Sequence, residues 1–366
     1  MHGNIIFLKP VSGDCLTNKA GVLSQDGSAL LVTVRVAAPA QRQISICGVP
    51  ARYAAGAHFA TVQLTAYQNT VTAQDELGNT AEITVYWLPE ATNTYRLSLD
   101  DNIRFLRDIA KNCDTYRTIF DNPYLSLLRE AHERYGTKVH ANLFFETPDE
   151  GGFSLLEMPD RFKNEFRANA DWLRFSFHAK AELPDKPYID TDYARIAADL
   201  ATVREQILRF AGEEAYAAAT TTVHWGECTR EGVRALHDAG VRVLAGYLQW
   251  SEKHDRGVVS YYLDRAQVAN TAAYGIWKDQ ESDMIFSKID VVLNSGSLQE
   301  ITEALDAAWA AYPQKGFWEF LMHEQYFYPD YRKHLPDFKA RIFAALDWAE
   351  RHHLTPAFLS KTHLGK

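Results

Sequence analysis

Acidic and imidazole side chains stand at the ends of separate apolar runs in this chain. These side chains are Asp100, Asp101, His178 and His323. In an adjacent carboxylate pair, one member can hold a divalent cation while the other accepts a proton from the water that the cation acidifies. An imidazole suits proton donation because its pKa lies near neutrality. Residue types of this kind can carry acid–base or metal chemistry, although for an isolated Asp pair the favoured interpretation is that it caps the following helix.

Alternating strands and helices are predicted to bring these side chains together. Strand-like runs cover residues 97–99, 138–145, 172–177, 219–223, 241–247, 317–322 and 356–359. Helical periodicity covers residues 103–110, 123–136, 160–171, 191–211, 229–239, 297–312 and 336–353. Such alternation predicts an α/β domain over residues 91–366, namely a distorted (β/α)7-8 barrel of parallel strands. The carboxyl ends of its strands would form the active-site face.

The first 90 residues have a different texture, with apolar residues at every second position. Strands are predicted at residues 29–36, 43–47, 58–67 and 80–87, and Asp26-Gly27 and Gly78-Asn79 are typical hairpin turns. This pattern predicts a small all-β sandwich, with a linker at residues 89–93. Residues 44–49, 56–62, 69–73 and 78–79 resemble bacterial immunoglobulin-like modules attached to carbohydrate-active enzymes. The resemblance implies a spacer or a substrate-presenting module.

Composition excludes several classes of partner. The formal charge of −9 argues against nucleic acid and anionic membranes, since neither would meet a positive surface. No window is long and apolar enough for a membrane span, and the start lacks a signal peptide. A cytoplasmic location is the default expectation, or a secreted one if a signal has been removed. The separate cysteines Cys15, Cys47, Cys113 and Cys228 indicate neither a zinc ribbon nor a disulfide framework. The oligomeric state stays open.

The stretch Ser98-Leu99-Asp100-Asp101-Asn102 resembles the first motif of the polysaccharide deacetylases, carbohydrate esterase family 4. That motif reads Thr-Phe-Asp-Asp-Gly, and the resemblance covers the chain from about residue 95 onward. It implies that Asp100 is the general base and that Asp101 is a metal ligand. The family fold is a distorted barrel of parallel strands and helices.

The second motif of that family is His-x-x-x-His, which supplies two metal ligands. Here His178 matches the first position and Glu182 stands at the second. The resemblance therefore implies a divalent metal on Asp101, His178 and Glu182. Zinc is the expected ion, and the carboxylate at 182 leaves room for another divalent cation.

The third motif, Arg-x-Pro-Tyr-Gly, aligns with residues 222–226. Thr222 replaces the arginine that orients the base in the family. The backbone N–H of Trp225 can still stabilise an oxyanion. His224 and Glu227 are additional polar groups here, and either one is a candidate to orient Asp100, to bind metal or to contact substrate.

The last motif, Leu-x-His, matches Leu321-Met322-His323 and implies that His323 is the general acid. Nearby acidic and aromatic residues are candidates for binding a sugar ring. The predicted substrate-binding residues are His224, Glu227, Trp250, Glu324 and Tyr326.

The sequence predicts a metal-dependent hydrolase that deacetylates an N- or O-acetylated carbohydrate. Two alternatives stay open. One is a glycoside hydrolase on a related barrel, with Asp100 and either Glu227 or Glu324 as its carboxylate pair. The other is a non-catalytic carbohydrate-binding protein with a degenerate deacetylase site.

Overall fold

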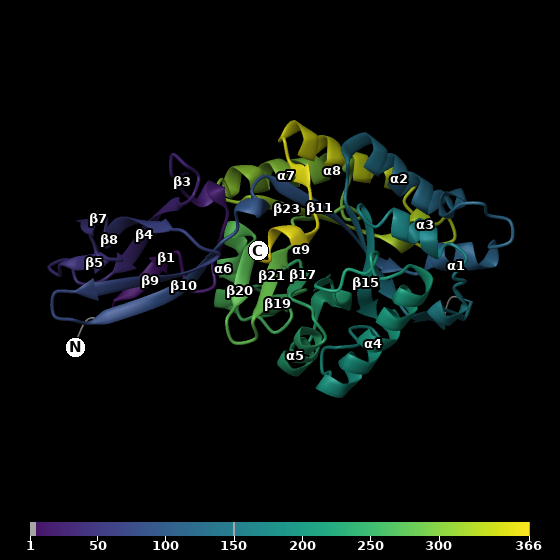
Figure 1. The fold of residues 1–366 in the computed structure, drawn as a ribbon, viewed down its shortest axis with the longest axis horizontal. Helices are drawn as coiled ribbons and strands as arrows, with labels where there is room; N and C mark the ends of the chain where they lie inside the picture. The colour runs from purple at the N-terminus through teal and green to yellow at the C-terminus, as the bar shows by residue number, and fades with distance from the viewer. Residues whose placement is uncertain (1–4, 149–150, 366) are drawn as a thin grey trace.

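The computed structural model describes residues 5–148 and 151–365, and Figure 1 shows an all-β part beside a larger α/β part. In the all-β part, one sheet has the order β1-β4-β8-β7 with β3 also paired to β4. The other sheet has the order β2-β10-β9-β5-β6. Their bounds are β1 (Ile6–Lys9), β2 (Cys15–Leu16), β3 (Val22–Leu23), β4 (Leu30–Ala37), β5 (Ile44–Ile46), β6 (Val49–Pro50), β7 (Arg52–Ala54), β8 (Ala57–Leu64), β9 (Gln68–Asp75) and β10 (Thr80–Trp87).

The two sheets pack on one apolar core. In β4, Leu30, Val32, Val34 and Val36 are buried while the residues between them are more exposed, as expected of a strand with one face on a core. The predicted sandwich is present, and its immunoglobulin-like identity stays a prediction. The predicted strand 58–67 ends earlier, at Leu64, because β9 starts a new strand after the turn.

The α/β part is built on a parallel sheet with the order β15-β12-β11-β23-β22, and β24 pairs with β11. Each of these pairs is parallel. Every residue of β11 is buried, as is typical of a central strand covered on both faces. The bounds are β11 (Thr94–Asn102), β12 (Val139–Phe144), β15 (Leu173–Ala179), β22 (Val291–Val292), β23 (Phe317–His323) and β24 (Thr355–Pro356).

A second sheet has the order β16-β17-β21-β20, and β20 runs antiparallel to β21. Its bounds are β16 (Thr220–Thr221), β17 (Val243–Gly246), β20 (Ile276–Asp279) and β21 (Met284–Lys288). A parallel bridge between Phe175 in β15 and Tyr216, which precedes β16, connects the sheets on one side. On the other side the chain passes from β21 into β22, and Asp290 N between them donates to Glu319 O at 2.9 Å. The predicted closed barrel needs correction, because strand pairing among the described residues forms two separate sheets rather than one continuous ladder.

Helices cover the sheets (Figure 1), and their ends follow local sequence signals. Asn122 accepts from Leu125 N at the start of α2, which ends at Gly136 in the left-handed region. Ser297 and Glu300 form the predicted capping box of α7. The sequence did not predict α6, β20 and β21. Its final strand, predicted at residues 356–359, is present as the shorter β24, and α9 begins at Leu359. The bounds are α1 (Arg104–Lys111), α2 (Pro123–Tyr135), α3 (Lys163–Ala168), α4 (Tyr193–Phe210), α5 (Arg230–Asp238), α6 (Arg265–Tyr274), α7 (Leu298–Ala311), α8 (Phe338–Arg351) and α9 (Leu359–Thr362).

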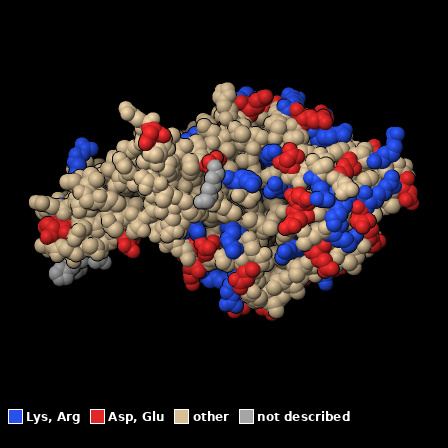
Figure 2. All heavy atoms as spheres, viewed as in Figure 1, with Lys and Arg blue, Asp and Glu red and all other residues tan. Residues whose placement is uncertain are grey.

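Two short hairpins complete the strands, β13 (Glu146–Thr147) with β14 (Phe153–Ser154), and β18 (Gln249–Ser251) with β19 (Arg256–Val258). On the face shown in Figure 2, Lys and Arg are interspersed with Asp and Glu over the α/β part. No helix in the described ranges has both the length and the apolar character that a membrane crossing requires.

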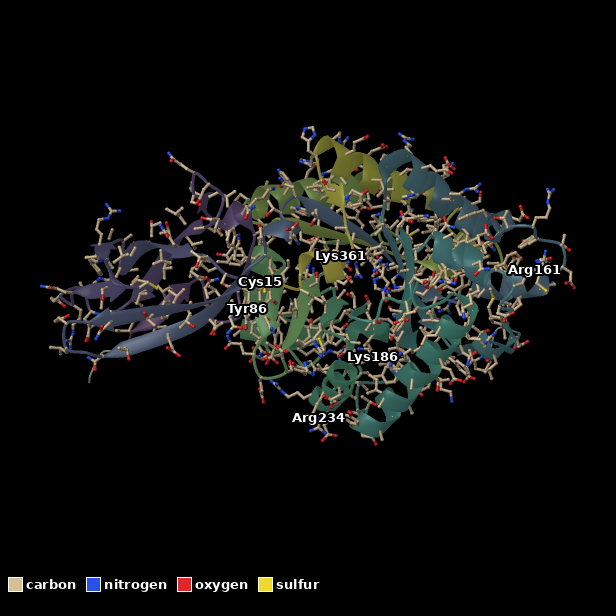
Figure 3. The ribbon with its side chains drawn as sticks, viewed as in Figure 1. Cys15, Tyr86, Arg161, Lys186, Arg234 and Lys361 are labelled. Carbon is tan, nitrogen blue, oxygen red and sulfur yellow. The ribbon has the colours of Figure 1, made fainter. Side chains whose placement is uncertain are left out.

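The all-β part packs directly on the second sheet. Cys15 and Tyr86, labelled in Figure 3, share an apolar cluster with Ile276. Trp277 Nε1 donates to Ser12 O at 2.9 Å. Within residues 89–93, predicted to be a linker, Ala91 is fully buried in the same apolar cluster, while Pro89, Glu90 and Asn93 are exposed. The division of the chain into domains 1–90 and 91–366 stays a prediction.

Candidate functional site

Polar side chains from separate parallel strands meet at the carboxyl edge of the larger sheet. Asp100, near the end of β11, is the register partner of His323 at the end of β23. His178 lies near the end of β15. Because parallel strands end at one edge of a sheet, residues far apart in sequence become neighbours there. The structure therefore brings these strand-end residues together.

A cavity of about 630 Å³ opens over this edge. Most of the residues singled out in the sequence line it, namely Asp100, Asp101, His178, Glu182, His224, Trp225, His323 and Tyr326. Tyr247 and Tyr331 add further aromatic surface to its wall. Aromatic rings of this kind suit the apolar face of a sugar.

Asp101, His178 and His224 form a compact buried triad. His178 Nε2 lies 3.0 Å from Asp101 Oδ1, and His224 Nδ1 lies 3.2 Å from the same oxygen. The two imidazole nitrogens are 3.1 Å apart. Ligands at about 2.0–2.1 Å from a tetrahedral ion lie roughly 3.3 Å from each other, which is close to these separations. The triad therefore has the size of a metal site.

The hydrogen bonding of His178 favours a cation inside the triad. Its Nδ1 donates to Thr222 O at 2.5 Å, so the neutral ring presents a bare Nε2 to the Asp101 carboxylate. Burial lowers the pKa of His178, which opposes a second proton on this ring. His224 Nε2 is buried without a hydrogen-bond partner in the described part of the chain. With its hydrogen on Nε2, His224 also presents a lone pair at Nδ1, and a divalent cation fits this donor set.

Gln325 holds the other oxygen of Asp101, with Nε2 donating to Oδ2 at 2.8 Å. Burial by itself would raise the pKa of Asp101, but the imidazoles of His323, His178 and His224 outweigh it and hold that pKa well below its usual range. Asp101 is thus a carboxylate, the form that binds metal. Gln325 lies two positions after the Leu-x-His motif, and no sequence motif pointed to it.

Asp100 is buried beside the triad and has a different environment. Asn142 Nδ2 donates to its Oδ1 at 2.6 Å. Burial raises the pKa of Asp100 well above its usual range, and the charge of Asp101 acts in the same direction. The two neighbouring carboxyl groups are therefore driven apart in pKa, which suits one to hold a cation and the other to accept a proton.

His323 faces the cavity in a fixed orientation. Its Nδ1 donates to Asn294 Oδ1 at 2.7 Å, so Nε2 is the atom directed toward Asp101 Oδ2, 4.0 Å away. Burial lowers the pKa of His323, although Asp101 opposes this effect. The orientation makes Nε2 the atom available for proton transfer.

Backbone strain accompanies the site. Asp101 has φ 59° and Trp225 has φ 60°, a region that non-glycine residues rarely adopt. The turn at Trp225 lets the preceding His224 point into the triad while the Trp225 side chain stays 45% exposed. Sequence alignment alone does not predict this turn.

The structure separates three of the predicted residues from the triad. Glu182 is exposed in the loop after β15 and lines the cavity without belonging to the triad. Glu227 accepts from Lys186 Nζ at 3.0 Å; Lys186 is labelled in Figure 3. Trp250 packs against the main apolar core and is not among the lining residues.

Glu324 has a structural position rather than the predicted place in the cavity. Its carboxylate is fully buried and accepts the backbone N–H groups of Ile103, Arg104 and Phe105 at 2.6, 2.9 and 2.6 Å. It thus caps the start of α1, where unpaired N–H groups need an acceptor. With Glu324 turned away and Glu227 paired outside the cavity, neither residue forms a glycosidase pair with Asp100.

No protein-family model and no curated protein matches the chain. Among solved structures, a peptidoglycan N-acetylglucosamine deacetylase is 12% identical with a TM-score of 0.41, over 76% of this chain and 92% of that chain. A mutant of a pseudoenzyme of carbohydrate esterase family 4 is 8% identical with a TM-score of 0.34, over 80% of this chain and 85% of that one. A 4-alpha-glucanotransferase from Thermococcus litoralis is 12% identical with a TM-score of 0.46, over 74% of this chain and 40% of that chain. These likenesses are too distant to assign a function, so function is inferred from the side chains of the site.

Proposed function

We propose that the chain is a divalent-metal-dependent hydrolase that removes an acetyl group from an N- or O-acetylated carbohydrate. The observation that carries the proposal is the meeting, in one cavity, of the buried triad with a carboxyl group and an imidazole that lie outside it. The sequence motifs around Asp100, His178 and His323 point to the same chemistry.

The metal is proposed to lie on Asp101, His178 and His224. This assignment gives His224 the position that the sequence motif gave to Glu182, because the His224 nitrogen lies within the triad. Two imidazoles and a carboxylate suit zinc, with at least one coordination position open to other groups. When bound, such an ion supplies positive charge that acidifies water and polarises a carbonyl oxygen.

The surrounding residues have separate roles in this proposal. Asp100 accepts a proton from the attacking water as general base. The backbone N–H of Trp225 donates a hydrogen bond to the carbonyl oxygen as negative charge develops on it. His323, protonated at Nε2, donates that proton to the leaving nitrogen or oxygen as the acyl bond breaks.

The cavity wall is proposed to bind the sugar. The Trp225 and Tyr326 side chains line the same cavity as the triad, with Tyr247 beside them. Stacking of such rings on a sugar contributes binding energy in the cavity that the triad also lines. A protein that kept only this wall would bind carbohydrate without hydrolysing it.

Metal analysis combined with acetate release tests the proposal. The purified protein is expected to hold about one divalent ion per chain, and D101A and H178A are expected to lose it. His237 lies on α5 outside the cavity, so H237A is a matched control that keeps the ion. Loaded wild-type protein should release acetate from a panel of N- and O-acetylated oligosaccharides. Metal without acetate release would indicate a binding protein, and reducing sugar released despite chelation would indicate a glycosidase.

A further inference from the structure

Asn142 connects the proposed base to the interior of the sheet. It lies in β12 and is fully buried. Its Nδ2 donates to Asp100 Oδ1 at 2.6 Å, and its Oδ1 accepts from Ser176 Oγ at 2.6 Å and from Thr222 N at 3.2 Å. Exchange of the amide oxygen and nitrogen would set donor against donor at Thr222 N. The amide therefore has one orientation, with its NH₂ group toward Asp100.

The chain of hydrogen bonds continues inward to a buried arginine. His140 Nε2 lies 2.8 Å from Ser176 Oγ, and His140 Nδ1 lies 2.8 Å from Arg96 Nη1. Arg96 in turn forms a buried ion pair with Glu319. All four side chains between Glu319 and Asp100 are at most 2% exposed, so water does not interrupt the series.

The direction of every bond in this series is determined by its two ends. A guanidinium can only donate, so His140 Nδ1 accepts and its Nε2 carries the hydrogen. His140 then donates to Ser176, whose own hydrogen goes to the Asn142 oxygen. Burial and the charge of Arg96 lower the pKa of His140 well below its usual range, in keeping with a neutral ring. Each group therefore donates toward Asp100, and aligned bonds of this kind polarise one another.

We infer that Asn142 is the positioning residue of Asp100 and that it is aligned by the buried series Arg96, His140 and Ser176. The inference rests on the proposed function in taking Asp100 as the base. It answers what orients this carboxyl group, since Thr222 stands where the resembling family has an arginine. With Oδ1 engaged by Asn142, the other oxygen of Asp100 is left to accept the proton of water.

The experiment compares N142L, N142A and S176A with wild type. Leucine keeps the branched shape of asparagine but is larger and cannot donate to Asp100, and alanine removes the same donor without adding bulk. For N142L and N142A, kcat for acetate release should fall about 100-fold with KM and metal content unchanged, because a base out of position loses most of its contribution. S176A removes the hydrogen bond to the Asn142 amide oxygen but leaves the bond from Asn142 to Asp100, and it should lower kcat about tenfold. S176A also serves as the test if both substitutions at 142 prevent folding.

Asn122 supplies the matched control, because it is a buried asparagine that caps α2 outside the site. N122A should lose stability but keep kcat and KM. If N142L or N142A folds and keeps the wild-type kcat, the inference is overturned. If neither of them folds, a wild-type kcat in S176A overturns it. If wild-type protein itself releases no acetate, the proposed function fails. Crystal structures of the same variants then still test whether Asn142 holds the Asp100 carboxyl group in place. Asp100 Oδ1 is then expected to leave its wild-type place, and an unmoved carboxyl group would overturn the inference.

Discussion

Asp100 and His323 are direct register partners on the neighbouring parallel strands β11 and β23, although they lie 223 positions apart in the chain. Each is held by a carboxamide, Asp100 by Asn142 at 2.6 Å and His323 by Asn294 at 2.7 Å. A neutral amide fixes direction without adding charge. The proposed base and acid are therefore oriented by groups that do not titrate.

Removal of His224 should distinguish the two candidate third ligands. Because its Nδ1 lies 3.1 Å from His178 Nε2 within the triad, H224A should weaken metal binding by at least about 100-fold. Glu182 is exposed and outside the triad, so E182A should keep wild-type affinity. Competition with a chelator of known affinity measures both. If E182A loses the metal and H224A retains it, the third ligand is Glu182, as the sequence motif implies.

Gln325 should affect the metal through Asp101. Its amide fixes Asp101 Oδ2 at 2.8 Å, so Q325L should lower metal affinity by about 10–100-fold without removing a ligand. Gln299 is exposed on α7, where its amide donates to Glu303, and Q299L is the control with no expected effect. Equal affinities of Q325L and wild type would show that Asp101 needs no such support.

Glu324 should make stability depend on pH. Burial raises its pKa to about 7 in the folded chain, against about 4.3 for an ordinary glutamate. The folded state therefore binds the proton more tightly, so this contribution is full below about pH 4 and is lost as pH rises through about 7. Relative to E324Q, the wild-type free energy of unfolding should fall by up to about 3–4 kcal/mol between those limits.

Urea denaturation of wild type and E324Q across this pH range measures the difference. The same carboxylate accepts three backbone N–H groups, and those bonds act in the opposite direction. A wild-type stability that rises with pH relative to E324Q would show that capping of α1 outweighs burial.

The Trp225 ring should contribute to substrate binding rather than to the chemical step. W225A keeps the backbone N–H that is proposed to contact the carbonyl oxygen, so kcat should stay within about threefold while KM rises about tenfold. Tyr53 of the all-β part is equally exposed, at 45%, and Y53A is the matched control with unchanged KM. A fall in kcat with constant KM would instead place the ring in the chemistry.

Local sequence determined much of the framework. Period-two runs located β4, β5, β8 and β10 of the sandwich, and helical periodicity located α2, α4, α5, α7 and α8, because a buried face imposes its spacing on the residues that cover it. The same logic placed Asp100, Asp101, His178 and His323 at strand ends. The elements in residues 265–288 were not predicted. In this segment α6 is followed by two antiparallel strands, β20 and β21, whereas the domain was expected to alternate strand and helix.

Only the tertiary structure decided which side chains share the site. His224 rather than Glu182 joins the triad because the backbone turns through φ 60° at Trp225, and Glu324 turns away because the start of α1 needs its carboxylate. His140 and Asn142 left a trace in the sequence as polar residues within an apolar run. Their partners lie on other strands, however, and hydrogen-bond direction depends on those partners. Sequence spacing thus predicted where the strands end, and three-dimensional packing determined what meets there.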